Sequence, residues 1–378
     1  MIYLDYSATT PVDATVIDKF IKISTTYIGN PNSLHKLGRD AKQVIDDTTL
    51  YIANLLGVLP DEIIYTSGAS ESNNLAIKGL CTKNAKKGKH IITSEFEHSS
   101  VIAPINYLQK QGFDVDFIKL DANGLVDLKH FKALLKDTTI LVSLASVNSE
   151  LGMYTQVEEI GKILLSYPNC TFHVDATQSL GKENIDLTNV DLASFSAQKS
   201  YGLKGIGLLV KKNDVIIEPI IHGGKSTTIF RSGTPALGLI ASLAPTFAIA
   251  YDNEKAKFNY VKSLNDDLRI FFKQYKNVYI NSPLSSIPHI LNISIKGIDA
   301  NDMLSAFDKK DIYISTQTAC AFGTTPSRSV LVLTGDIELA KSSIRISLSY
   351  LTTKDELNTF KQAFDLIYKE FNHEDINL

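Results

Sequence analysis

Cysteine is scarce in this chain: its 378 residues contain Cys81, Cys170 and Cys320, at wide and uneven spacing. An odd number of distant cysteines argues against a disulfide framework and against a zinc site, so we expect no bound metal. The sequence also lacks an apolar run of about 18 residues, and we expect no membrane span. Its first residues include Asp5 and no long apolar run, which argues against a secretory signal. Together these absences predict a cytoplasmic protein.

An excess of charge of one sign is lacking as well. The formal net charge is −3, and the densest basic stretch, residues 83–89, contains no aromatic residue. Such a stretch is typical of a solvated helix end and turn, so we expect no direct contact with nucleic acid. Apolar residues make up 44% of the chain and charged residues 21%, as in soluble globular proteins. The length exceeds that of one ordinary core and predicts two domains.

Short β-rich runs alternate with helical stretches over roughly residues 60–210. This alternation predicts an α/β domain with a mostly parallel sheet. Before it, residues 36–56 place their apolar side chains on one helical face. The expected strands are residues 63–66, 90–93, 115–120, 139–145, 171–175, 190–195 and 206–210.

The last third of the chain has a different character. Residues 237–275 predict one long helix, and further strands are expected beyond Asn277, with helices between and after them. This pattern predicts a smaller α+β domain at the C-terminal end. Its expected strands are residues 290–295, 312–315 and 343–349.

Small residues follow the first expected strand of the α/β region, at the edge where ligands collect in such sheets. They form the run 67–72, which leads into a helix expected from Asn73. Backbone N–H groups at a helix start favour an anion, and Ser70 adds a hydroxyl donor. A plain helix cap explains the same run equally well.

A carboxylate and a lysine follow two later strands. Asp175 ends a buried strand and needs a cationic partner, which a protonated pyridine nitrogen or a structural salt bridge would provide. Lys199 follows the strand at 190–195, so its amine can reach the same crevice and form a Schiff base. Most lysines are solvated surface groups, and the case for Lys199 depends on its sharing one sheet edge with Asp175 and the anion site.

With these residues the sequence resembles the fold-type I pyridoxal-phosphate enzymes of the class-V aminotransferase group. More narrowly, it resembles the NifS/IscS-like branch of cysteine desulfurases. The resemblance runs nearly end to end, and many short matches in the right order make it specific. It is carried by residues 3–11, 29–35, 66–72, 97–98, 173–178, 231–234 and 343–345.

The resemblance implies an architecture and an assembly. The fold would be a mostly parallel seven-stranded sheet in a large domain over residues 13–255. A smaller α+β domain would comprise residues 1–12 and 256–378, with the first dozen residues lying across the active site. The protein would be a homodimer.

The resemblance also implies a cofactor, pyridoxal 5′-phosphate, carried by Lys199. Asp175 would pair with its pyridine nitrogen, and Gln178 would hydrogen-bond its phenolic oxygen. His98 would stack on the ring and shuttle protons, which suits an imidazole; without the family, His98 is typical of a helix N-terminus. The phosphate would be held by Ala69, Ser70, Ser196, Gln198 and, across the dimer interface, Thr234.

The implied reaction is the conversion of L-cysteine to L-alanine. Arg345 would hold the substrate carboxylate, with Asn30 and Asn148 as further substrate contacts. The sulfur would pass to Cys320 as a persulfide, and then to an acceptor protein that serves iron–sulfur clusters or tRNA thiolation. Residues 315–326 are small, polar and without hydrophobic period, so Cys320 is expected on a loop, where a thiolate can form. Cys81 and Cys170 fit the buried apolar role instead.

Three positions depart from the family pattern. Gln198 stands where histidine is usual, and both side chains can donate to a phosphate. Ser149 replaces an asparagine that normally faces the cofactor and substrate. Residues 223–228 lack the usual third glycine and its acidic follower. These changes leave open another class-V enzyme, either a selenocysteine lyase or a transaminase, and also a weakly catalytic sulfur-relay scaffold.

Overall fold

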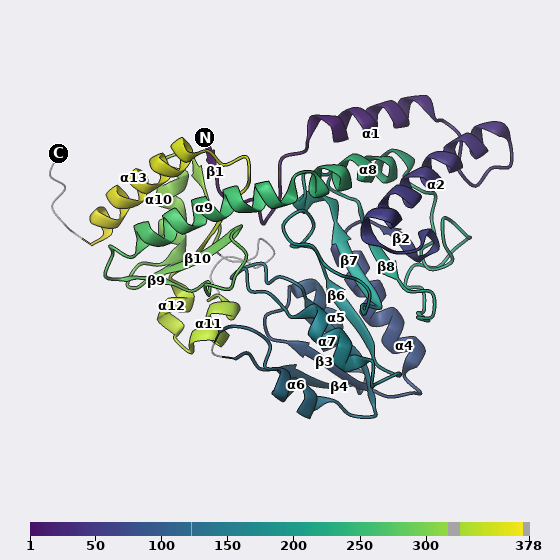
Figure 1. Ribbon diagram of the computed structural model, residues 1–378, viewed down its shortest axis with the longest axis horizontal. Helices are drawn as coiled ribbons and strands as arrows, with labels where there is room; N and C mark the ends of the chain where they lie inside the picture. Colours follow the sequence, from purple (N-terminus) through teal and green to yellow (C-terminus); the bar gives the residue numbers. More distant parts are fainter. Residues whose placement is uncertain (122, 317–325, 373–378) are drawn as a thin grey trace.

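The computed structural model describes the chain except for residues 122, 317–325 and 373–378. A seven-stranded sheet forms the centre of its larger part (Figure 1). From one edge to the other the strands follow the order β2, β8, β7, β6, β5, β3, β4. In chain order they are β2 (Ile63–Thr66), β3 (His90–Ser94), β4 (Asp114–Ile118), β5 (Thr139–Ala145), β6 (Thr171–Asp175), β7 (Leu192–Ser196) and β8 (Gly207–Lys211).

This sheet is mostly parallel, as the sequence predicts. Strands β4, β3, β5, β6 and β7 pair in parallel, whereas β8 pairs antiparallel with both β7 and β2. Parallel strands need crossover connections, and helices supply them on both faces. The strand positions also match the predicted runs to within two residues at each end.

Helices cover both faces of the sheet and complete a three-layer arrangement. Because side chains alternate along a strand, Ile63 and Tyr65 of β2 join the apolar core on one face while Ile64 joins the core on the other. The first core includes side chains of α2 (Lys36–Leu56), α6 (Leu128–Leu134), α7 (Val157–Leu164) and α8 (Leu237–Tyr251). The second includes the π-helical turn Leu75–Gly79, α4 (Leu80–Asn84) and α5 (Ser99–Gln109), and α3 (Ala69–Asn74) leads into that turn.

The C-terminal part has its own small sheet and its own apolar core. Strand β10 (Ile290–Ile295) pairs antiparallel with β12 (Ser343–Ser347) and β9 (Val278–Ile280), and β1 (Ile2–Tyr3) pairs in parallel with β11 (Ile312–Tyr313). The helices that pack here are α9 (Glu254–Phe272), α10 (Ala300–Asp308) and α13 (Lys354–Phe371). The remaining helices are α1 (Ala14–Thr26), α11 (Arg328–Thr334) and α12 (Ile337–Lys341), with short 3₁₀ turns at Pro60–Glu62 and Ala197–Lys199.

Two sequence-based expectations about these elements are wrong. The long helix predicted over residues 237–275 is two helices, because Asp252 is extended and Asn253 adopts a left-handed conformation with φ of 49°. The helix predicted from Asn73 begins four residues earlier, at Ala69. Strands β1 and β9 were not expected; with two and three residues they are too short for an alternating pattern to show.

The N-terminal segment ties the two parts together, and the chain start lies beside α9 and α13 (Figure 1). The backbone N–H of Ser347 in β12 donates to Leu4 at 2.7 Å, and Thr10 donates through its own N–H to the carbonyl of Gln198 at 2.9 Å. Residues 1–10 therefore run from the small sheet to the end of β7. No helix in the described part of the chain is long and apolar enough to cross a membrane.

Candidate active site

A cavity of about 210 Å³ opens at the carboxyl ends of β2, β5, β6 and β7. It lies where the general rule for open α/β sheets places a ligand. The structure brings most of the predicted site residues to its wall: Ala69, Ser70, His98, Ser149, Asp175, Gln178, Ser196, Gln198, Lys199 and Arg345.

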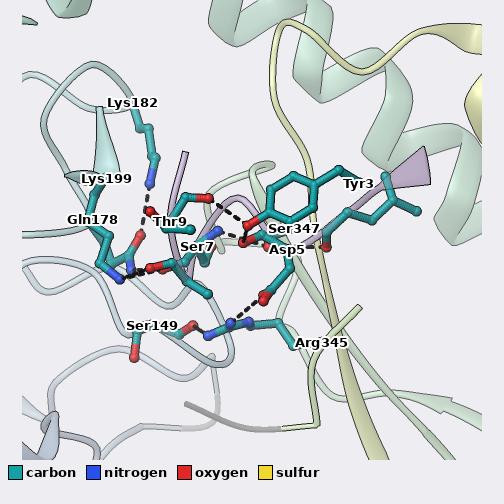
Figure 2. A network of polar contacts seen from close by, with 12 residues as sticks. Tyr3, Asp5, Ser7, Thr9, Ser149, Gln178, Lys182, Lys199, Arg345 and Ser347 are labelled. Carbon is teal, nitrogen blue, oxygen red and sulfur yellow. Dashed lines mark hydrogen bonds and ion pairs between the residues drawn. The ribbon is translucent and has the colours of Figure 1, made fainter. Parts of the chain in front are cut away.

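Lys199 lies in the 3₁₀ turn directly after β7, and its amine points toward the N-terminal segment (Figure 2). Its Nζ donates to the backbone carbonyl of Ser7 at 3.0 Å and to that of Ala8 at 2.5 Å. The short turn therefore fixes the lysine backbone, and the N-terminal carbonyls fix its amine. These two carbonyls gave no signal in the sequence, because every residue carries one.

Asp175 ends β6, and both oxygens of its carboxylate accept hydrogen bonds. One oxygen accepts from the backbone N–H of Thr177 at 3.1 Å and from its hydroxyl at 2.5 Å. The other accepts from the side-chain amide of Asn73 at 2.8 Å. The carboxylate also lines the cavity, where it can pair with a cation. Asn73 is fully buried on α3, and sequence reasoning had marked it only as a helix start.

The Asn73 amide also joins Asp175 to His98. It donates to Ser100 Oγ at 2.9 Å, and Ser100 Oγ lies 2.8 Å from Nδ1 of His98. His98 is the N-cap of α5, and its Nδ1 accepts the backbone N–H of Ser100 at 3.1 Å. Because Nδ1 faces a backbone donor, the hydrogen-bond network assigns the proton of the neutral ring to Nε2.

Burial lowers the pKa of His98, and the nearby Asp175 carboxylate offsets part of that effect. The ring is therefore mainly neutral near pH 7. The sequence suggested either a helix cap or an active-site residue, and His98 both caps α5 and lines the cavity.

Arg345 projects from β12 and lines the cavity on the side opposite Lys199 and Gln178 (Figure 2). Its Nη2 pairs with Asp5 at 2.8 Å, and its Nη1 donates to the backbone carbonyl of Ser149 at 2.9 Å. Its Nε is buried and has no hydrogen-bond partner among the described residues. Because the Ser149 contact uses a backbone carbonyl, the replacement of asparagine by serine leaves that contact intact.

Three predicted site residues lie outside the cavity wall. The side chain of Asn30 accepts the N–H of Asn32 at 2.9 Å, and Thr234 is exposed. Asn148 donates to Phe96 O at 2.7 Å and accepts two backbone N–H groups, so its amide shapes the loop that carries Ser149. The substrate and partner-subunit contacts predicted for these residues stay predictions. Cys320 lies outside the described residues.

Comparison with known proteins agrees with this geometry. Residues 2–360 match the aminotransferase class-V family. The chain belongs to that family.

Within it, the sequence is 38% identical to a NifS/IcsS protein homolog of Lactobacillus delbrueckii subsp. bulgaricus, over 98% of both chains. It is 41% identical to the cysteine desulfurase IscS of Klebsiella pneumoniae, over 97% of this chain and 92% of that one. A solved NifS-like protein superimposes with a TM-score of 0.92 at 32% identity, covering 98% of this chain and 99% of the other. The chain is thus a class-V member of the NifS/IscS type with the fold-type I architecture, and its cofactor is pyridoxal phosphate.

The residues of the cavity fit this cofactor. Asp175 supplies a buried anion for a protonated ring nitrogen, and Lys199 supplies an amine for covalent attachment. Ser70 and Ser196 line the same cavity, where their hydroxyls and the first turn of α3 can donate to a phosphate. The cavity wall thus offers a partner for the ring nitrogen of the cofactor, for its point of attachment and for its phosphate.

Proposed function

We propose that this chain is a cysteine desulfurase that converts L-cysteine to L-alanine and moves the sulfur first to Cys320 and then to an acceptor protein. The observation that carries the proposal is the shared cavity of Lys199, Asp175, His98 and Arg345. An amine, a buried carboxylate, an imidazole and a guanidinium around one space suit an amino-acid substrate bound to pyridoxal phosphate.

The cofactor supplies an electron sink when it is bound. We propose that Lys199 holds it covalently, that Asp175 keeps its ring nitrogen protonated, and that Gln178 donates to its phenolic oxygen. Its phosphate would be held by Ala69, Ser70, Ser196 and Gln198 of one subunit and by Thr234 of a second subunit, which makes the active protein a homodimer.

Substrate recognition would depend on Arg345. Two N–H groups of the guanidinium already donate to Asp5 and to the Ser149 carbonyl, so the guanidinium is held in one orientation. A guanidinium has five donors, and a substrate carboxylate would take those that remain. Asn30, Asn148 and Ser149 would shape the rest of the substrate pocket.

His98 would accept and donate protons during the reaction. Its neutral ring carries the proton on Nε2 and anchors Nδ1 on the start of α5. The ring is therefore fixed against the cavity wall, where it can stack on the cofactor and exchange protons with the substrate.

Cys320 would be the sulfur acceptor within the enzyme. Burial strongly raises the thiol pKa of Cys81 and of Cys170, so neither forms a thiolate near neutral pH. In the proposed step the Cys320 thiolate attacks the substrate sulfur. An S–S bond forms as the substrate C–S bond breaks, and the electron pair of that bond stays on carbon, which is protonated and leaves as alanine.

The wider setting follows from the same chemistry. A persulfide on Cys320 can be handed to a scaffold for iron–sulfur clusters or to a tRNA-thiolation enzyme, and we propose an acceptor of this kind in the cytoplasm. We also propose the division into a large domain over residues 13–255 and a small domain of residues 1–12 and 256–378. Among the described residues, the apolar core of the C-terminal part, which includes Ile2 and Leu4, is separate from the cores that flank the large sheet, and this supports that division.

The first test compares alanine release from L-cysteine, with dithiothreitol present, by the wild type and by Cys320→Ser. We expect alanine from the wild type and a loss of at least about a hundredfold in the variant, since the nucleophile is gone. Equal release by both would favour a lyase and exclude Cys320 as the sulfur acceptor. Cys81→Ser is the matched control and should keep the wild-type rate.

A further inference from the structure

Lys182 is a buried lysine that the proposed mechanism does not use. It lies four residues after Gln178, is 8% exposed and is not part of the cavity wall, and its amine points toward the side chain of Gln178 (Figure 2). Its Nζ donates to Oε1 of Gln178 at 2.8 Å. Burying a charged amine costs free energy unless the amine is hydrogen-bonded or paired, so its contacts indicate why it is there.

The contact settles which way the Gln178 amide points. An amide group has an acceptor end and a donor end of nearly the same shape, so its orientation depends on its partners. An ammonium only donates, so Oε1 must face Lys182, and Nε2 then faces Ser7, to whose carbonyl it donates at 3.0 Å. The amine of Lys199 donates to that same carbonyl at 3.0 Å. Lys182, Gln178, Ser7 and Lys199 thus form one hydrogen-bonded chain.

We propose that Lys182 is a positioning residue that acts through Gln178 and keeps the NH₂ group of this amide turned toward the cofactor. This inference rests on the proposed function, in which Gln178 donates to the phenolic oxygen of the cofactor. If the amide turned over, its carbonyl oxygen would face that phenolic oxygen, and a donor would be replaced by a second acceptor.

The charges around Lys182 agree with a fixed, dry contact. Burial and the positive charges of Lys199 and Arg345 lower its pKa to about 7, and His289 is a further titratable neighbour. Below this pH the ammonium only donates and fixes Oε1 of Gln178. Above it the neutral amine can also accept, and the Ser7 carbonyl, which only accepts, then keeps Nε2 in place.

The experiment follows the cofactor absorption band as a function of pH in the purified enzyme with its cofactor. The variants are Lys182→Met, Gln178→Ala and the double variant. A donor to the phenolic oxygen favours its ionised form, so its loss should raise the titration midpoint by about one pH unit. We expect this rise in Lys182→Met and in Gln178→Ala. The double variant should rise no further than Gln178→Ala alone.

Two further variants control for charge and for folding. Lys211→Met removes another buried lysine, 3% exposed, from the far end of β8, and should leave the midpoint unchanged. Lys182→Arg keeps a head group that only donates and should stay near the wild-type midpoint. If Lys182→Met does not fold, Lys182→Gln is measured instead, because its side chain can accept as well as donate and no longer requires Oε1 of Gln178 to face it.

The outcomes separate the possible errors. A Lys182→Met midpoint equal to that of Lys211→Met would overturn the inference. Additive shifts in the double variant would overturn it too, because Lys182 would then act by its charge and not through Gln178. A wild type that binds no cofactor would remove the proposed function itself, and with it the inference.

Discussion

Beside His98, the side chain of Glu97 faces inward and holds together two loops of the active site. One of its oxygens accepts the hydroxyl of Ser94, and the other accepts the backbone N–H of Ala145 at 2.8 Å. Burial, followed by the nearby charge of Asp175, raises the pKa of Glu97 to about 8. The carboxyl is therefore protonated at neutral pH in the folded chain.

This shift makes the stability of the protein depend on pH. In the unfolded chain Glu97 loses its proton near the ordinary value of 4.5, and in the folded chain near 8. Between these values the folded state binds a proton that the unfolded state does not. The contribution to stability is thus complete below pH 4.5 and is lost as the pH rises toward 8, by at most about 1.4 kcal/mol per pH unit.

Glu97→Gln removes this titration and should flatten the dependence. Its Oε1 can still accept the N–H of Ala145, and its Nε2 can donate to the hydroxyl oxygen of Ser94. Urea unfolding of wild type and variant at pH 5.5, 6.5, 7.5 and 8.5 measures it. The free energy of unfolding of the variant relative to that of the wild type should rise from pH 5.5 to 7.5 and level off near pH 8. A constant difference between the two proteins would show that Glu97 does not carry the shift.

Individual site residues also show what could be predicted from the sequence and what could not. Asp175 and Lys199 could be found because each follows a recognisable strand, and strand ends are where ligands bind. Asn73 and Lys182 could not, because a buried amide and a buried amine look in the sequence like any polar residue of a helix or turn. Their roles depend on partners that only the folded chain brings within 3 Å.

At the scale of elements, strand β8 lies against the turn that leads into α3. A Cβ atom on Gly207 would stand 2.4 Å from Phe195 O and 2.7 Å from Cα of Gly68. Both are backbone atoms, which cannot rotate away. The glycine therefore allows β8 to approach the start of the proposed phosphate site.

Gly207→Ala should lower the free energy of unfolding by about 1–3 kcal/mol, because the backbone must move to make room. It should also weaken cofactor binding, since the turn at Gly68 precedes the residues proposed to hold the phosphate. Thermal unfolding and equilibrium dialysis of the cofactor measure the two effects. Gly224→Ala, where nothing lies within 4 Å of the added atom, is the matched control and should change the stability by less than about 0.5 kcal/mol.

Element prediction succeeded where a pattern was long enough to read. The helix Lys36–Leu56 and the strands Thr139–Ala145 and Ile290–Ile295 were predicted at their observed bounds. The prediction of a continuous helix over 237–275 failed because it joined two helical patterns across Asp252 and Asn253. These two residue types are typical of turns, and Asn253 tolerates the left-handed conformation that separates the helices.

At the scale of the whole molecule, one buried arginine joins three distant parts of the chain. Arg345 of the small sheet pairs with Asp5 of the N-terminal segment and donates to Ser149, which follows β5 of the large sheet. Arg345 is 1% exposed, so its charge depends on Asp5 for compensation. The ion pair thus holds the small sheet and the N-terminal segment together, and it also fixes the guanidinium at the proposed substrate site.

Asp5→Ala should therefore cost about 3–5 kcal/mol of stability, because it leaves a buried guanidinium without a counter-ion. It should also raise the KM for L-cysteine, since Arg345 would lose its fixed orientation. Urea unfolding and steady-state kinetics test both effects. Asp266→Ala removes an exposed partner of Lys262 in α9 and should cost less than about 1 kcal/mol with KM unchanged. Equal losses in the two variants would contradict the role given to Asp5.

By itself the sequence determined the mostly parallel sheet, the family, the cofactor and most of the side chains around the cavity. The sheet could be predicted because strand periodicity is local. The family, the cofactor and most site residues followed from the resemblance, which is carried by short runs of neighbouring residues. Only the tertiary structure decided how those side chains are held. Ser7 and Ala8 fix Lys199, Ser7 also accepts from Gln178, and Asp5 pairs with Arg345, which lies 340 positions away. Contacts between residues so far apart in the chain depend on the packing of the whole molecule, which no local pattern records.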